Sequence, residues 1–143
     1  MRSEADATVL AFDFGTRRIG VAGGNTLTRI AHPLATLAAD DASRCFDAIA
    51  ALIDEWRPQQ LVVGLPMHAD GTAHAMTAQS RAFARELGRR CGLPVALEDE
   101  RYTSEVAQST LTAQRRGRRA DRALRDQVAA QIILQAWLDR DDD

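Results

Sequence analysis

The chain has 143 residues and a formal net charge of −2, and it contains no lysine, so that all of its 18 strongly basic side chains are arginines. The absence of lysine excludes a nucleotide-binding loop that depends on a lysine, and any mechanism that proceeds through a Schiff base. A length of 143 residues predicts one domain over residues 1–143, with flexible tails at 1–6 and 139–143.

No apolar stretch in the sequence is long enough to cross a bilayer, and the first residues lack the basic start and apolar core of a secretion signal. The two cysteines, Cys45 and Cys91, lie far apart in sequence and outside any metal-ligand spacing, which predicts reduced thiols. We therefore expect a cytoplasmic protein that has no membrane partner.

The predicted elements begin with a β-hairpin, in which strands over residues 8–13 and 18–23 flank a tight glycine turn, and a third extended segment follows around 28–33. Apolar residues at three- and four-residue spacing then predict a helix from Ala42 to near Pro58. A buried strand over 61–65, a helix over 72–91, a fifth strand over 93–97 and two final helices complete the chain.

This order of elements predicts an α/β fold with a five-stranded mixed sheet. The hairpin supplies antiparallel strands, whereas each strand-helix-strand passage needs a right-handed crossover that leaves its two strands parallel. Because these crossovers place helices against the sheet, we expect helices to cover both of its faces.

Acidic residues stand at the ends of predicted elements at three places, which are Asp13, the cluster at residues 98–100, and Asp126. The carboxyl ends of parallel strands form one edge of a sheet, so Asp13 after the first strand and Glu100 after the fifth can converge there. Asp126 is expected near the N-terminus of the last helix and on its inward face, where an isolated charge is unfavourable without a compensating cation.

The last helix itself supports an inward position for Asp126. Ala129, Ala130 and Ile133 follow at the spacing of one helical face, and the two alanines would let the helix approach the sheet closely. A shared Mg²⁺ or Mn²⁺ would favour the ionised form of clustered carboxylates, and it could activate water and neutralise a phosphodiester. The alternative interpretation is a turn residue at Asp13, a solvated loop at 98–100 and a helix cap at Asp126.

An arginine-rich segment over residues 115–125 is predicted to be a mobile loop between the two final helices. Guanidinium groups bind phosphates bidentately and hold a nucleic-acid backbone without reading its sequence. A solvated run of charge is the alternative interpretation. The six arginines of this segment are Arg115, Arg116, Arg118, Arg119, Arg122 and Arg125.

Four motifs in order give the chain a resemblance to a known family. They are FDFGTRRIGVA at residues 12–22, VGLP at 63–66 with DGT at 70–72, DERYTS at 99–104, and Asp126 followed by AA at 129–130 and ILQ at 133–135. With these motifs the chain resembles the bacterial pre-16S rRNA nucleases of the YqgF/RuvX type, which are relatives of Holliday junction resolvases. The resemblance covers residues 10–138.

This resemblance implies an RNase H-like fold and metal-dependent phosphodiester cleavage, with Asp13, Glu100 and Asp126 as the catalytic and metal-binding triad. Asp99 is the alternative ligand after the fifth strand. Relatives usually carry a lysine shortly before the last aspartate, and here Arg125 is its natural substitute. The implied nucleic-acid-binding residues outside the arginine-rich segment are Gly15, Thr16, Arg17, Arg18, Arg101 and Thr103.

Precursor 16S rRNA is the substrate that the resemblance implies, with processing at its 5′ end and with Mg²⁺ or Mn²⁺ as the cofactor. Cleavage of branched DNA and a non-catalytic role in RNA binding and ribosome assembly are the alternatives, and a weak homodimer is compatible with each. The turn after Asp13 is also similar to the first phosphate-binding loop of actin-like and sugar-kinase ATPases. Such enzymes need two lobes, and 143 residues supply one.

Overall fold

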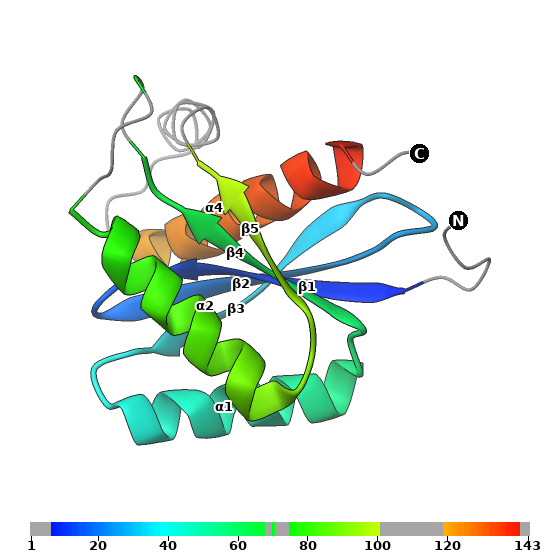
Figure 1. Cartoon of the computed structure of the whole chain (residues 1–143). Coiled ribbons are helices and arrows are strands. Elements are labelled where there is room, and N and C mark those ends of the chain that lie inside the picture. The colour runs from blue at the N-terminus through cyan, green and yellow to red at the C-terminus, as the bar shows by residue number, and fades with distance from the viewer. Residues whose placement is uncertain (1–6, 68–69, 71–74, 101–118, 141–143) are drawn as a thin grey trace.

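A computed structural model of the protein describes residues 7–67, 70, 75–100 and 119–140, with side chains in the last range from residue 122 onward. The elements are shown in Figure 1. In chain order they are β1 (Thr8–Phe14), β2 (Arg18–Asn25), β3 (Ala31–Ala38), α1 (Ala42–Trp56), β4 (Gln60–Leu65), α2 (Thr77–Cys91), β5 (Val95–Asp99) and α4 (Arg119–Arg140).

The strands form a five-stranded mixed sheet in the order β3-β2-β1-β4-β5. β1 and β2 pair in antiparallel orientation, as do β2 and β3, whereas β4 lies parallel to both β1 and β5. The carboxyl ends of β1, β4 and β5 therefore lie at the same edge of the sheet. The prediction of a mixed five-stranded sheet is confirmed.

Helices cover both faces of the sheet, also as predicted (Figure 1). Alternate residues of β1 point to opposite faces, and Leu10 and Phe12 join the core on the side of α1 and α2. Val9 and Ala11 join a second core with Ile133 and Leu134 of α4. Among the described residues, none of the helices has the length and apolar character that crossing a membrane requires.

Three predicted boundaries differ from the structure, and local backbone chemistry accounts for two of them. The third strand begins at Ala31 rather than near residue 28, because Asn25 closes a turn in which its side-chain oxygen accepts the N–H of Leu27. The α2 helix begins at Thr77 rather than at residue 72. β5 covers 95–99 rather than 93–97, because α2 ends in the left-handed conformation of Gly92.

The prediction of a mobile arginine-rich loop up to residue 125 is wrong for its second half, since α4 already begins at Arg119. No glycine or proline follows Gly117 in the rest of the chain, and the buried face of α4 stabilises the helix against the sheet. Arg122 and Arg125 are exposed residues of this helix. Residues 101–118, where the other final helix was expected, lie outside the described residues.

Candidate acidic active site

Asp13 lies near the end of β1 on the face of the sheet that α4 covers. It alternates with Val9 and Ala11, which pack against α4. Its partner across the antiparallel pair is Gly20 of β2. The sequence thus places a carboxylate on an otherwise apolar face, at the edge where the parallel strands end.

The backbone of α4 rests directly on β2 at this point, and so brings Asp126 to Asp13. A Cβ atom at Gly20 would lie 1.9 Å from the carbonyl oxygen of Asp126, so only a glycine permits this approach. The close approach that the alanines of α4 predicted is therefore present. The prediction that Asp126 lies near a helix N-terminus is wrong, because α4 begins seven residues earlier at Arg119.

Glu100 reaches the same face from the end of β5. Its N–H donates to the carbonyl oxygen of Leu65 at 3.1 Å, which continues the pairing of β5 with β4. A Cβ atom at Gly64 would lie 2.6 Å from Oε2 of Glu100 and 2.4 Å from Cδ1 of Ile133 on α4. The Glu100 carboxylate therefore lies over Gly64, in space that a larger residue there would fill.

Strand alternation separates Glu100 from its neighbour Asp99. Asp99 pairs with Leu65 as the last residue of β5, so its side chain points to the face opposite that of Glu98 and Glu100. Glu98 is buried on the α4 side, where its carboxylate accepts a hydrogen bond from Arg140 at 2.5 Å. Of the two adjacent acids, Glu100 shares a face with Asp13.

Asp13 and Glu100 are both partly buried, which disfavours their ionised forms. Desolvation, followed by the nearby charge of Asp126, raises the pKa of Asp13 from 3.8 to about 7. Desolvation, followed by the charges of Asp13 and Asp99, raises the pKa of Glu100 from 4.5 to about 8. A bound cation would remove this penalty, because it compensates the charges that repel one another.

Asp126 is held by an arginine from the first hairpin. Nε of Arg18 donates to Oδ2 of Asp126 at 2.6 Å, and the two side chains are 37% and 18% exposed. Arg18 was predicted as a nucleic-acid-binding residue, whereas its observed contact is with the acidic group. An arginine at this position compensates one of the carboxylates and still reaches solvent.

The donor chemistry of Asp13, Glu100 and Asp126 fits a hard divalent cation, because Mg²⁺ and Mn²⁺ prefer carboxylate oxygens. The arrangement is not that of a closed metal cage. Within the described part of the chain, no three His, Cys, Asp or Glu side chains are placed to hold one ion together, and Arg18 occupies an oxygen of Asp126. The three acids thus share a face and a charge environment without a formed coordination sphere.

Some of the other predicted site residues lie at the same edge of the sheet as the acids, and the rest lie outside the described part of the chain. Gly15, Thr16 and Arg17 form the turn between β1 and β2, and a Cβ atom at Gly15 would lie 2.6 Å from the carbonyl oxygen of Arg18, so the turn requires glycine. Of Arg119 only the backbone, in α4, is described. The predicted residues outside the described part are Arg101, Thr103, Arg115, Arg116 and Arg118.

Some residues that assemble the site from distant parts of the chain were not predicted. Gly20 had a detectable signal, since glycine inside a strand often marks a close approach of another group. The pairs Arg18–Asp126 and Glu98–Arg140 had none, because they join residues that are 108 and 42 positions apart. Only the folded sheet brings these side chains together.

The sheet order and the placement of the helices define an RNase H-like fold, and solved structures share it. The chain is similar to Thermus thermophilus RuvC in complex with a Holliday junction substrate, with a TM-score of 0.52 and 16% identity, covering 94% of this chain and 95% of that one. It is also similar to the yeast mitochondrial Holliday junction resolvase Ydc2, with a TM-score of 0.56 and 12% identity, covering 91% and 77%.

Residues 7–140 match the family described as "RuvX: Holliday junction resolvase", and the chain belongs to this family. A relative from Nitrosospira multiformis is 55% identical over 134 residues, which are 93% of this chain and 88% of the relative. One from Chromobacterium violaceum is 55% identical over 133 residues, covering 92% and 96%. Both are named "Putative pre-16S rRNA nuclease", which confirms the resemblance seen in the motifs.

Proposed function

We propose that the protein is a divalent-metal-dependent nuclease that hydrolyses phosphodiester bonds in the cytoplasm, with the 5′ end of precursor 16S rRNA as its substrate. The observation that carries the proposal is the placement of two partly buried carboxylates with raised pKa values, Asp13 and Glu100, on one face of the sheet, at the edge where β1 and β5 end. Burying two carboxylates lowers the stability of a fold, so their presence calls for a function that uses them.

Asp13, Glu100 and Asp126 would hold Mg²⁺ or Mn²⁺ in this nuclease. When bound, such an ion activates water and neutralises the charge of the phosphodiester under attack. Asp13 and Glu100 would hold the ion in their ionised forms, which their raised pKa values disfavour when no cation compensates the charge. Asp126, whose Oδ2 accepts a hydrogen bond from Arg18, would be the third carboxylate ligand, and the partly exposed guanidinium of Arg18 would be close enough to bind a phosphate of the substrate.

The arginines around the acids would bind the nucleic-acid backbone. Arg17 lies in the turn beside Asp13 and the partly exposed Arg18 begins β2, whereas Arg122 and Arg125 are exposed on α4 ahead of Asp126. Their guanidinium groups bind phosphates bidentately and without base specificity, so binding is expected to weaken steeply as the salt concentration rises. The remaining arginines of the predicted binding set are included in this proposal on the basis of the sequence only, because their side chains lie outside the described part of the structure.

RNA is our first choice of substrate because the relatives that are about half identical to this chain carry the name of a pre-16S rRNA nuclease. Cleavage of branched DNA is the second candidate. It is favoured by the family description and by the fold shared with Thermus thermophilus RuvC, which was solved in complex with a Holliday junction substrate. Cleavage of RNA and cleavage of branched DNA would use the same three acids. The two activities differ in the kind of nucleic acid that the surrounding arginines bind.

The test is cleavage of two substrates, a 16S leader RNA and a four-way DNA junction, by the purified protein with Mg²⁺ or Mn²⁺. An Asp13→Asn variant should lose cleavage, whereas Asp47→Asn, which changes an exposed acid on α1, should keep it. The substrate that is cut decides between RNA and branched DNA. Salt-sensitive binding of RNA without cleavage of either substrate would contradict the nuclease and support a non-catalytic assembly factor.

A further inference from the structure

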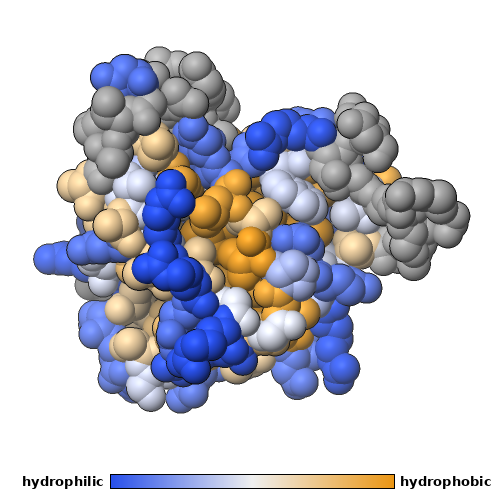
Figure 2. Space-filling model, viewed as in Figure 1, coloured by the Kyte–Doolittle hydropathy of each residue, from blue (hydrophilic) through white to orange (hydrophobic). Residues whose placement is uncertain are grey.

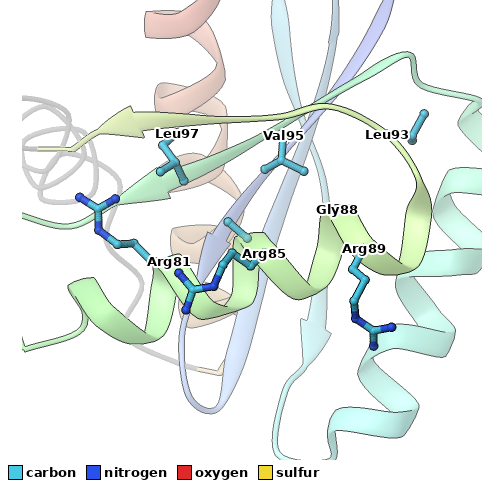
Figure 3. Close-up of a pocket in the computed structure, with 8 residues that line it drawn as sticks. Arg81, Arg85, Gly88, Arg89, Leu93, Val95 and Leu97 are labelled. Atoms are coloured by element: carbon cyan, nitrogen blue, oxygen red, sulfur yellow. The ribbon is translucent and has the colours of Figure 1, made fainter.

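A groove runs between α2 and the edge strand β5, on the face of the sheet opposite to the acids. It has a volume of about 430 Å³, and its floor is apolar, formed by Ala84, Gly88, Leu93, Val95 and Leu97. Figure 3 shows Val95 and Leu97 pointing from β5 toward α2. At Gly88 a Cβ atom would lie 3.3 Å from Cγ2 of Val95, so the small residue lets the helix lie close to the strand.

One side of this groove carries a row of arginines. Arg81, Arg85 and Arg89 follow at four-residue spacing on α2, so they lie along one side of the helix, and all three are exposed. Glu86 pairs with Arg89 at 2.6 Å. Arg81 and Arg85 have no ion-pair partner among the described residues, so their charge is available to a ligand.

The apolar floor lies beside the open edge of a strand. β5 is the last strand of the sheet in the described part of the chain, and its recorded pairing there is with β4. Leu97 is 38% exposed at this edge. Figure 2 shows the resulting surface, an apolar area in the centre of this face with a row of hydrophilic residues beside it. Open edges with apolar side chains readily accept a further strand.

We propose that this groove binds an extended, acidic segment of another protein. Apolar side chains of the segment would contact Val95 and Leu97, its carboxylates would pair with Arg81 and Arg85, and its main chain would extend the sheet at β5. Charge complementarity selects this occupant, because an arginine row beside an apolar floor matches alternating acidic and apolar residues. The groove is separate from the acidic site and is independent of the proposed nuclease activity.

Two other occupants fit the groove less well. A second copy of the chain in a symmetric pairing would bring its own arginine row to the same interface, where like charges repel. A single strand of nucleic acid would find phosphate ligands, but bases stack on aromatic rings, and the floor residues are aliphatic. An acidic peptide satisfies both the charge and the apolar floor.

The experiment measures fluorescence anisotropy with a dye-labelled peptide of alternating glutamate and leucine, and with a matched peptide of lysine and leucine. The wild-type protein should bind the acidic peptide and not the basic one. Replacing both rim arginines, Arg81→Glu with Arg85→Glu, should weaken binding about tenfold or more. The matched control is Arg44→Glu, the same charge reversal at an exposed position of α1, which should leave the affinity unchanged.

Amide resonances of isotopically labelled protein locate the peptide, and those of β5 and α2 should shift. The proposal is overturned if the acidic peptide does not bind, or if the double variant, folded by circular dichroism, binds as the wild type does. It is also overturned if short oligouridine displaces the peptide, which would assign the groove to nucleic acid. A dimer that dissociates in Leu97→Asp would assign the groove to a second copy instead.

Discussion

Replacing Asp13 by asparagine should stabilise the metal-free protein at neutral and alkaline pH. The raised pKa of Asp13 means that the folded state disfavours its ionised form. A change of pKa from 3.8 to about 7 corresponds to about 4 kcal/mol in the free energy of unfolding, at about 1.4 kcal/mol for each pKa unit. The asparagine amide needs hydrogen-bond partners of its own, so we expect a net gain of about 2–3 kcal/mol at pH 8.

The pH dependence has a definite sign. Below the unfolded pKa of 3.8 the Asp13 carboxyl is protonated in both states, and it contributes no penalty. As the pH rises toward about 7, the unfolded chain releases the proton while the folded state keeps it, so wild-type stability falls. The advantage of Asp13→Asn should therefore be small at pH 4, grow through this range and stay constant above it.

Urea unfolding in EDTA, followed by tryptophan fluorescence at several pH values, measures this difference. Asp47→Asn on the exposed side of α1 is the matched control and should unfold as the wild type does. Addition of Mg²⁺ or Mn²⁺ should stabilise the wild type and leave Asp13→Asn unchanged, because the metal binds only the ionised site. An Asp13→Asn variant that is less stable than the wild type at pH 8 would refute the reasoning.

Two further substitutions test the packing around the site. Gly20→Ala would place a methyl group 1.9 Å from the backbone oxygen of Asp126, which cannot give way, so we expect a loss of about 3 kcal/mol in urea unfolding. Gly23→Ala is its control, because its new contacts at 3.5 Å and beyond are ordinary; equal losses in both variants would contradict the close approach of α4. Arg140→Ala should cost about 1–2 kcal/mol at pH 8, because it leaves the buried Glu98 carboxylate without this partner. Burial raises the pKa of Glu98 above its ordinary value of 4.5, so the loss should shrink at pH 4, where the carboxyl takes up a proton, and a loss that does not depend on pH would contradict this account.

The layers of the fold could be predicted because burial repeats with a regular period. Strands that are covered on both faces have continuous apolar runs, and α1 has its apolar residues at helical spacing. The ends of elements that depend on a single turn were harder to predict from the sequence. The start of β3 is set by the side chain of Asn25, and the register of β5 follows from the left-handed Gly92 at the end of α2.

The site could be predicted only as far as the strand ends determine it. The convergence of Asp13 and Glu100 follows from parallel strands that share an edge. The choice of Glu100 over Asp99 rested on the family resemblance, because a strand predicted to end at residue 97 leaves both acids in a loop, where the alternation of strand side chains does not apply. The contact of Arg18 with Asp126 joins residues 108 positions apart, and local sequence contains no signal for it.

The most direct test of the acidic site compares Glu100→Gln with Asp99→Asn in the metal-dependent cleavage assay. The two residues are adjacent in sequence and point to opposite faces of β5, so this pair separates a role in the site from a general effect of lost charge. We predict that Glu100→Gln abolishes cleavage and that Asp99→Asn keeps it. Full activity in Glu100→Gln, or loss of activity in Asp99→Asn alone, would contradict the assignment of the catalytic face.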